Sequence, residues 1–269
     1  MTLNDIVREL EAAGIENAEN DALILAETFT GKSKDKLLFE KNADIGSREL
    51  DAALARRARR EPLQYIIGKW YFWREEYKVS PDCLIPRADS EIVVERATSV
   101  LPRGARFLDL CTGSGCLAIS ILASRPDLSA VAVDISERAL ELAKYNAAHN
   151  GVSDRIEFVC ADVMRDLPEN LGKFDAIISN PPYIRTSEIG ALAPELAFEP
   201  KIALDGGADG LDFYRKILED HKKLLKNGGT FIFEIGYDQA EAISALGGAG
   251  TKLFCDYSKN YRMAQITFL

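Results

Sequence analysis

The sequence predicts an α/β fold in which a small helical domain precedes a mostly parallel, doubly wound sheet. Two observations predict the sheet. Short apolar runs follow residue 105, most of them separated by helical segments, and a short polar stretch separates the last two runs. Such runs are typical of buried parallel strands, whereas the polar stretch is too short for a helical crossover, so the last two strands should pair antiparallel.

The first 60 residues contain three stretches with helical periodicity and no strand pattern. Apolar positions recur at helical spacing in residues 3–10, 22–29 and 50–57. A glycine follows each of the first two stretches, and Pro62 should end the third because a proline cannot continue a helix. We therefore expect a helical domain over residues 1–62.

Residues 63–80 differ from this block because they are rich in aromatic and β-branched side chains. With Arg74–Glu76 placed where a turn would be, they predict a β-hairpin linker. Next to it, residues 56–60 include four arginines. They could form a nucleic-acid-binding patch, or a helix end at which the cations face the negative end of the helix dipole. The acidic composition of the chain favours the helix end.

The remaining residues, 81–269, should form the domain that contains the sheet. The expected strands cover 106–110, 130–134, 156–160, 175–179, 230–235, 252–256 and 263–269, and the clearest helices cover 116–124, 137–149 and 211–225. A parallel sheet with one antiparallel terminal strand is the seven-stranded, Rossmann-like arrangement of class I methyltransferases.

Composition excludes several classes of function for this chain of 269 residues. A formal net charge of −9 argues against tight non-specific DNA binding, and no apolar window is long enough to span a membrane. The N-terminus lacks the pattern of a secretory signal, so we expect a cytoplasmic protein. Five cysteines without a paired spacing, and two histidines, predict neither a disulfide framework nor a metal site.

A glycine-rich turn follows the first expected strand and opens a helix. It consists of the candidate cofactor-binding residues Cys111, Thr112, Gly113, Ser114 and Gly115. Its glycines allow a sharp turn and a close approach to a ligand. Their spacing suits a dinucleotide as well as S-adenosylmethionine, so the turn alone does not choose between them.

Two acidic residues lie at the ends of the next two expected strands. Asp134 can accept hydrogen bonds from both ribose hydroxyls of a nucleoside. In methyltransferases, an acid at the position of Asp162 holds the adenine amino group, and the next apolar residue, here Val163, covers the ring. Either acid alone could be a helix N-cap, but carboxyl ends of neighbouring parallel strands meet in one crevice, which favours a cofactor site.

The fourth strand should end at Asn180-Pro181-Pro182-Tyr183, the strongest motif in the chain. The prolines fix two φ angles and remove two N–H donors, so the Asn180 side-chain oxygen and the Pro181 carbonyl can accept the hydrogens of a planar amine. Tyr183 can stack on the flat substrate group. Two fixed acceptors aim the weakly nucleophilic nitrogen at a methyl donor. The alternative is a proline turn that ends a strand.

The chain resembles the release-factor glutamine methyltransferases, the HemK/PrmC family, over essentially its whole length. Beyond the glycine turn and Asn180–Tyr183, the resemblance rests on segments 62–66, 84–87, 199–200, 203–207, 209–211 and 234–239, together with Gly68, Phe72 and Glu91. Asn-Pro-Pro-Tyr alone is shared with adenine-N6 and some guanine-N2 methyltransferases. Its combination with 62–66 and 85–87 is more specific.

The resemblance implies methyl transfer from S-adenosylmethionine to the side-chain amide nitrogen (N5) of glutamine in the Gly-Gly-Gln motif of class I peptide chain release factors. It implies a helical domain that docks the protein substrate. It also implies cofactor contacts from the glycine turn, Asp134, Val163 and Asn180, and glutamine contacts from Asn180, Pro181, Pro182 and Tyr183. Arg87 and Glu91 would lie near the cofactor or the joint between domains.

Two segments depart from the family pattern. Ala88-Asp89-Ser90 replaces the usual Pro-Glu-Thr, and between Asp256 and Arg262 only these two end residues fit. Three alternatives stay open: glutamine methylation of a ribosomal protein, adenine-N6 methylation of DNA, and a cofactor-binding scaffold without activity. The acidic charge and the short segments between motifs argue against DNA, and the intact Asn180–Tyr183 argues against a scaffold.

Overall fold

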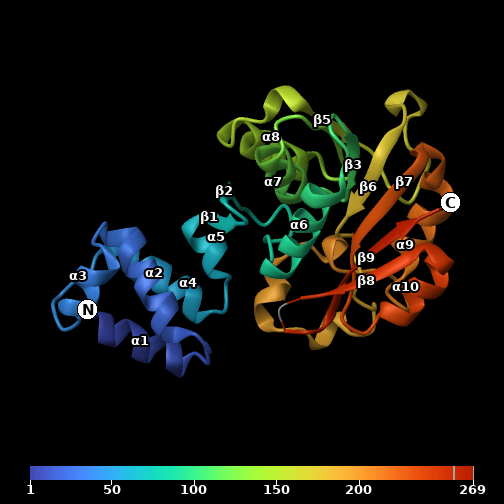
Figure 1. Cartoon of the computed structure of the whole chain (residues 1–269). Helices are drawn as coiled ribbons and strands as arrows, with labels where there is room; N and C mark the ends of the chain where they lie inside the picture. Colours follow the sequence, from blue (N-terminus) through green and yellow to red (C-terminus); the bar gives the residue numbers. More distant parts are fainter. Residues whose placement is uncertain (257, 269) are drawn as a thin grey trace. The chain divides into compact units, whose positions relative to one another are not determined.

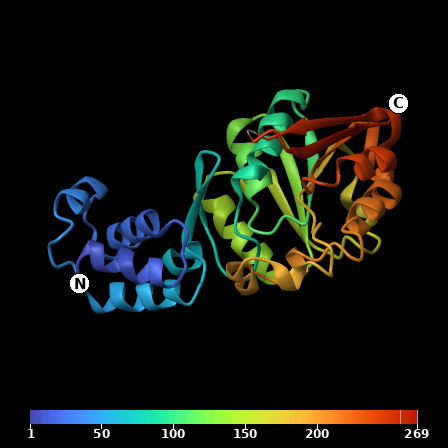
Figure 2. The same ribbon diagram turned by 90° about the horizontal axis from the view of Figure 1, so that it is seen from below.

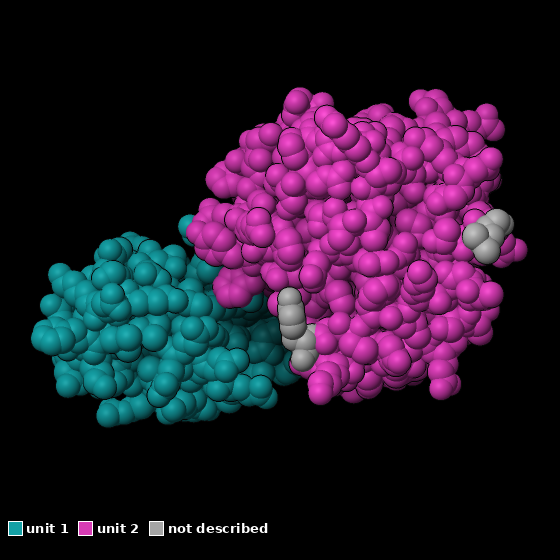
Figure 3. All heavy atoms as spheres, viewed as in Figure 1, with its two compact units in different colours: residues 1–69, 193–198 teal, residues 70–192, 199–269 magenta. Residues whose placement is uncertain are grey.

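The structure of the protein is a computed structural model that describes residues 1–256 and 258–268. It divides into two compact units (Figure 3). Unit 1 contains residues 1–69 and 193–198, and unit 2 contains 70–192 and 199–269. Leu269, the last residue of the expected final strand, and Tyr257, between Asp256 and Arg262, lie outside the described residues.

Unit 1 is helical. Its helices are α1 (Leu3–Ala12), α2 (Ala18–Thr30), α3 (Lys34–Phe39), α4 (Arg48–Ala58) and α5 (Leu63–Ile67). Thr2 and Asp5 form a capping box at the start of α1, and Gly31 ends α2 in the left-handed conformation. The three helices expected from periodicity are α1, α2 and α4. The short α3 and α5 were not expected, because one or two turns give no readable periodicity.

The β-hairpin is shorter than the sequence predicted. Residues 63–67 form α5 instead of a strand, because Pro62 caps its start and Gly68, at φ 75°, ends it. The hairpin consists of β1 (Lys69–Phe72) and β2 (Glu75–Lys78). Its turn lies at Trp73 and Arg74, one residue earlier than predicted, and Trp73 adopts a positive φ of 57°.

The arginines of residues 56–60 are largely committed to carboxylates inside unit 1. The buried Arg57 pairs with the buried Asp21 at 2.8 Å and with Glu195 at 3.1 Å. Arg60 also binds Glu195, at 2.8 Å, and Arg56 binds Glu61. The cluster is therefore an ion-pair network at the end of α4, which agrees with the helix-end interpretation and leaves little free charge for a phosphate backbone.

Unit 2 contains a seven-stranded sheet with the order β5-β4-β3-β6-β7-β9-β8 (Figure 1). Its strands are β3 (Arg106–Leu110), β4 (Ser129–Asp134), β5 (Ile156–Cys160), β6 (Phe174–Ser179), β7 (Leu225–Glu234), β8 (Thr251–Cys255) and β9 (Tyr261–Thr267). β3 to β7 pair in parallel, whereas β9 runs antiparallel to both β7 and β8. This confirms the predicted sheet and its antiparallel strand.

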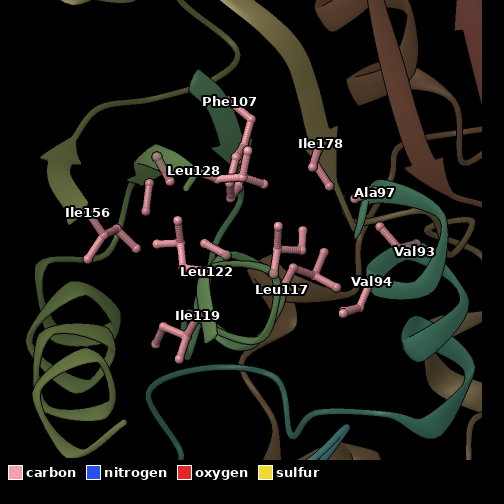
Figure 4. Close-up of a cluster of buried hydrophobic side chains, with 14 of the residues drawn as sticks. Val93, Val94, Ala97, Phe107, Leu117, Ile119, Leu122, Leu128, Ile156 and Ile178 are labelled. Carbon is pink, nitrogen blue, oxygen red and sulfur yellow. The ribbon is translucent and has the colours of Figure 1, made fainter. Parts of the chain in front are cut away.

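Helices cover both faces of the sheet (Figures 1 and 2). On one face, side chains of β3, β4 and β6 pack with α6 (Glu91–Val100), α7 (Cys116–Ser124) and α8 (Glu137–His149). Figure 4 shows this cluster, in which Phe107 and Ile178 from the sheet meet Val94 from α6 and Leu117 from α7. Alternate strand residues face the other cluster, which includes α9 (Asp212–Lys216) and α10 (Ala240–Gly247).

One predicted helix is irregular. Residues 211–225 form α9, then a π-helical turn over Ile217–His221 and a 3₁₀ turn over Lys222–Leu224. His221 is buried in this segment and its Nε2 lies 2.9 Å from the carbonyl oxygen of Val163. Sequence periodicity reports apolar spacing and does not distinguish these helix types. No helix in the described part of the chain is long and apolar enough to cross a membrane.

Candidate active site

A cavity of about 300 Å³ in unit 2 lies beyond the carboxyl ends of β3, β4, β5 and β6. In open α/β sheets this edge is where ligands bind. The cavity is lined by most of the residues that the sequence singled out: Cys111, Thr112, Gly113, Ser114, Asp134, Asp162, Val163, Asn180 and Pro182. Gly115, Pro181 and Tyr183 do not contribute to its lining.

The glycine turn forms one wall of the cavity. Cys111 and Gly113 adopt positive φ angles of 59° and 54°, and the backbone N–H of Thr112 donates to the carbonyl of Val133 on the neighbouring strand. Gly115 has a packing role instead. A Cβ there would come 2.8 Å from Cδ1 of Ile119, so the missing side chain lets the turn meet α7 closely.

Asp134 lies at the end of β4 with both carboxylate oxygens fixed. One oxygen accepts the N–H of Gly113 at 2.8 Å, and the other accepts the N–H of Ser136 at 2.9 Å. Burial raises the pKa of Asp134, and these backbone donors oppose the shift. Each oxygen keeps a lone pair for a further donor in the cavity, as two ribose hydroxyls would require.

Asp162 and Val163 follow β5 at the same edge. Asp162 accepts the N–H of Met164 at 2.9 Å and lies 3.3 Å from Nε of Arg165. No helix begins at Asp162, so these bonds hold a turn and Asp162 is not a helix N-cap; its side chain also lines the cavity. The buried Val163 beside it provides an apolar surface, so the pair presents an acceptor next to an apolar contact.

Asn180 presents its side-chain amide from the end of β6. Its Nδ2 donates to Oγ of Ser90 at 3.1 Å, which leaves the Oδ1 oxygen available to accept hydrogen bonds. Two hydrogen bonds hold Tyr183 in place. Its hydroxyl donates to Oε1 of Glu234 at 3.3 Å, and its backbone carbonyl accepts from Nε2 of Gln239 at 3.0 Å.

A buried glutamate anchors another part of the cavity lining, residues 82–87. Glu199 accepts the backbone N–H of Ile85 at 3.0 Å and a hydrogen bond from Arg87. Burial raises the pKa of Glu199, and the Arg87 guanidinium opposes that shift. Arg87 therefore lies at the cavity, as the resemblance implied. Glu91 lies at the hairpin, where it accepts the N–H of Trp73 at 2.8 Å.

Two further carboxyl groups, one at the end of β7 and one within β3, are buried. Glu234 ends β7 and accepts hydrogen bonds from Ser90 and Tyr183. Burial raises its pKa to about 7. Asp109 lies within β3, where Oδ2 accepts from the hydroxyl of Thr112 at 2.6 Å. Burial raises the pKa of Asp109 to about 7 as well, and the Thr112 bond opposes the shift.

The two segments that depart from the family pattern meet beside Glu234. Arg262 lies 3.3 Å from Asp89 and 3.6 Å from Asp256. These three residues, one from the first segment and two from the second, therefore form one ion-pair cluster. Arg262 also lowers the pKa of Glu234. The final hairpin is thus linked to the surroundings of Tyr183, a connection that the sequence analysis did not anticipate.

Ser90 and Glu234 are not predicted from the sequence as residues of the site. Ser90 stands in segment 88–90, which departs from the family pattern, and Glu234 belongs to the family segment 234–239. A signal for Glu234 was present, because a carboxylate directly after the apolar run 230–233 needs a buried partner. Ser90 carried no such signal, since a serine before a helix reads as a cap.

Two features define a class I methyltransferase. One is the parallel sheet with its antiparallel β9, and the other is the cavity between the glycine turn and Asn180-Pro181-Pro182-Tyr183. A family model for the methyltransferase small domain matches residues 89–207, and one for the PrmC N-terminal domain matches residues 2–68.

Two curated relatives are the release factor glutamine methyltransferases of Thermodesulfovibrio yellowstonii and Geobacter sulfurreducens. The first is 42% identical over 218 residues, covering 78% of this chain and 77% of the relative. The second is 39% identical over 251 residues, covering 92% and 86%. The chain therefore belongs to the release factor glutamine methyltransferase family.

A solved structure with the same fold is a methyltransferase from Pyrococcus furiosus. It is 20% identical, covers 71% of this chain and 87% of its own, and superposes with a TM-score of 0.54. At this identity the likeness describes the fold alone.

Proposed function

We propose that this protein transfers a methyl group from S-adenosylmethionine to the side-chain amide nitrogen of the glutamine in the Gly-Gly-Gln motif of class I peptide chain release factors. The observation that carries the proposal is the fixed amide of Asn180 at the edge of the cavity. The names of relatives that are 37–42% identical over most of the chain support the substrate.

The chemistry of the cavity fits S-adenosylmethionine. Asp134 would accept the ribose hydroxyls, Asp162 the adenine amino group, and Val163 would cover the adenine. The turn from Cys111 to Ser114 would lie along the rest of the cofactor, and Asn180 would lie at its reactive end. When bound, the cofactor supplies a methyl group on a sulfonium, which is a strong electrophile.

Asn180 would activate and orient the nucleophile, because the methyl donor is already a strong electrophile. A glutamine amide nitrogen is a weak nucleophile because its lone pair is delocalised into the carbonyl. The Oδ1 of Asn180 and the carbonyl of Pro181 would accept its two hydrogens, favour a pyramidal nitrogen, and aim the lone pair at the methyl group. The N–C bond would form as the S–C bond breaks, and the methylated nitrogen, now a very acidic cation, would release one proton to give the neutral methylamide. Pro182, which lines the cavity, keeps the loop rigid and adds no competing N–H.

We further propose a division of labour along the chain. The helical domain, residues 1–62, would dock the release factor, residues 63–80 would link the domains, and residues 81–269 would carry out methyl transfer. The ion pairs of Arg56, Arg57 and Arg60 support a protein partner over a nucleic acid, because these charges are already neutralised. Release factors act in the cytoplasm, where we place the enzyme.

The experiment is incubation of the purified protein with methyl-labelled S-adenosylmethionine and three substrates in parallel: release factors, a pool of ribosomal proteins, and DNA. We expect one methyl group on the glutamine of Gly-Gly-Gln, located by mass spectrometry of peptides. A release factor with that glutamine replaced by alanine is the control and should stay unlabelled. Label on a ribosomal protein or on DNA, with none on release factors, would contradict the proposal.

A further inference from the structure

We propose that Ser90 and Glu234 are positioning residues that decide which end of the Asn180 amide faces the substrate, and that Glu234 must be ionised to do so. The inference rests on the proposed role of Asn180. Ser90 contacts Asn180 and lines the cavity, whereas Glu234 contacts Ser90 and does not line the cavity.

The three side chains form a continuous hydrogen-bonded chain. Nδ2 of Asn180 donates to Oγ of Ser90 at 3.1 Å, and the Ser90 hydroxyl donates to Oε2 of Glu234. Ser90 is 2% exposed and Glu234 is 1% exposed, so water does not compete for these bonds. The other oxygen of Glu234 accepts the hydroxyl of Tyr183 at 3.3 Å.

The donor and acceptor roles in these hydrogen bonds follow from the protonation state of Glu234. An ionised carboxylate only accepts, so the single hydroxyl proton of Ser90 must point at Glu234. The oxygen of Ser90 then offers lone pairs to Asn180, and only the NH₂ end of the amide can donate to them. Oδ1 of Asn180 is thereby turned toward the cavity, where the substrate amide needs an acceptor.

Protonated Glu234 no longer fixes the orientation of the Ser90 hydroxyl and the Asn180 amide. A carboxylic acid can donate to Ser90, whose proton is then free to bond to Oδ1 of Asn180. The flipped amide would present its NH₂ group to the NH₂ group of the substrate, and two donors do not bond. Tyr183 would also face an acid that no longer offers two equivalent acceptors.

The charges around Glu234 come from several elements. Burial raises its pKa to about 7, against the opposing effects of Ser90, Arg262 and Tyr183, while Asp89 raises it further. The groups that face it or influence it are Arg262 on β9, Asp89 before α6, Tyr183 after β6, Tyr214 on α9 and Cys116 on α7. Asp256 acts through its contact with Arg262.

The expected consequence is an acid limb in kcat near pH 7. Below it, the protonated fraction of Glu234 grows and kcat falls tenfold for each pH unit, while KM for the release factor changes little. The Asp89→Asn variant removes a charge that raises the pKa of Glu234, so its acid limb should move to lower pH. Asp89 is half exposed, which makes this substitution easy to accommodate.

The test measures kcat and KM for a release factor between pH 5.5 and 8.5 in four variants. Glu234→Gln should lower kcat at least tenfold at pH 8 and flatten the acid limb, because Gln carries no ionisable group. Ser90→Ala should lower kcat similarly, whereas Ser90→Thr, which keeps the hydroxyl, should restore it. Asp89→Asn completes the set. Wild-type kcat in Glu234→Gln with an unchanged acid limb would overturn the proposal.

Two further measurements separate this inference from other failures. The far-ultraviolet circular dichroism spectrum should match the wild type in each variant, which shows that the fold is intact. Calorimetric binding of S-adenosylmethionine should match it in Glu234→Gln and Asp89→Asn, whose residues do not line the cavity. If Glu234→Gln does not fold, the comparison of kcat between Ser90→Ala and Ser90→Thr is the test. Equal kcat values in these two variants would overturn the proposal. If the wild type itself fails to methylate release factors, the proposed function fails instead.

Discussion

The backbone of Gly206 lies directly against the backbone of Tyr183. A Cβ atom on Gly206 would come 2.7 Å from the Cα of Tyr183 and 2.7 Å from the carbonyl oxygen of Pro182. Two backbone hydrogen bonds fix this approach, one from Ile184 to Leu204 and one from Gly206 to Ile184, at 2.9 and 2.8 Å. The segment around Gly206 thus supports the loop that presents Asn180.

Gly206→Ala should therefore displace this loop. We expect methyl transfer to fall at least tenfold, with a lower melting temperature, because backbone atoms cannot move aside as a flexible side chain would. Gly190→Ala is the matched control, since a Cβ there meets nothing within 4 Å. Steady-state kinetics and thermal melts report both effects. Equal activity in the two variants would show that the loop tolerates the shift.

Asn180→Ala tests the acceptor itself. Loss of one preorganised hydrogen-bond partner of the reacting group should lower kcat by about 10²–10³. Affinity for S-adenosylmethionine should change far less, because Asp134 and the glycine turn remain. The exposed Asn227→Ala on β7 serves as the control. An unchanged kcat in Asn180→Ala would remove Asn180 from the mechanism.

Asp134→Ala should weaken cofactor binding. Removing a carboxylate that accepts two ligand hydroxyls should raise the dissociation constant of S-adenosylmethionine about 10–100-fold, as hydrogen bonds to charged groups contribute about 1.5–3 kcal/mol. Isothermal titration calorimetry measures this directly. Asp154, whose side chain is 79% exposed, provides Asp154→Ala as a control that should bind normally. Unaltered binding in Asp134→Ala would place the ribose elsewhere.

Arg57→Ala should destabilise unit 1. It leaves the buried Asp21 without its guanidinium and removes a partner of Glu195, which should cost about 3 kcal/mol. Arg8, 77% exposed and paired with Asp5 at 3.6 Å, gives the control Arg8→Ala, with an expected change below about 0.5 kcal/mol. Urea unfolding followed by circular dichroism compares them. Equal midpoints would mean that the Arg57 network contributes no net stability.

The stability of the protein should depend on pH through Asp109. Its pKa is about 7 in the folded state and near 4 in the unfolded chain, so the folded state holds an extra proton between these values. This contribution to stability is lost as the pH rises through that window. Asp109→Asn should remove the loss, so its stability relative to the wild type should improve by up to about 1.4 kcal/mol per pH unit.

Unfolding of Asp109→Asn, wild type and the surface control Asp154→Asn at pH 5, 6 and 7 would measure this difference. The control should follow the wild type, because Asp154 is mostly exposed. Parallel curves for Asp109→Asn and the wild type would show that Asp109 titrates alike in both states.

Most of the sheet was predictable from the sequence because β3, β4, β5 and β6 are short, mostly apolar runs, whereas β7 begins at Leu225, five residues before the predicted strand, in a polar stretch. Residues 106–110 and 156–160 were predicted to the residue, as were the helices 116–124 and 137–149. The helix α5 was not, since Tyr65, Ile66 and Ile67 suit a strand by composition. Pro62 and Gly68, which cap this helix, determine the local structure, and residue propensities do not include the effect of such caps.

The residues of the candidate site were predictable where they lie at the ends of predicted strands. The glycine turn, Asp134, Asp162 with Val163, and Asn180 each follow a strand, and parallel strands bring their ends together. The link from Asn180 to Ser90 and Glu234 was not predictable, because Ser90 contacts Asn180 across 90 residues of chain and Glu234 contacts Ser90 across 144. Only the register of the sheet and the position of α6 bring such residues together.

The short segment 193–198 belongs to unit 1 although its neighbours in sequence belong to unit 2. The polypeptide therefore crosses from one unit to the other three times, after residues 69, 192 and 198. A single proteolytic cut would not yield two self-sufficient fragments. An N-terminal fragment ending near residue 69 would lack Glu195, the shared partner of Arg57 and Arg60. A deletion of the helices would leave residues 193–198 without their packing partners, immediately before Glu199 at the cavity wall.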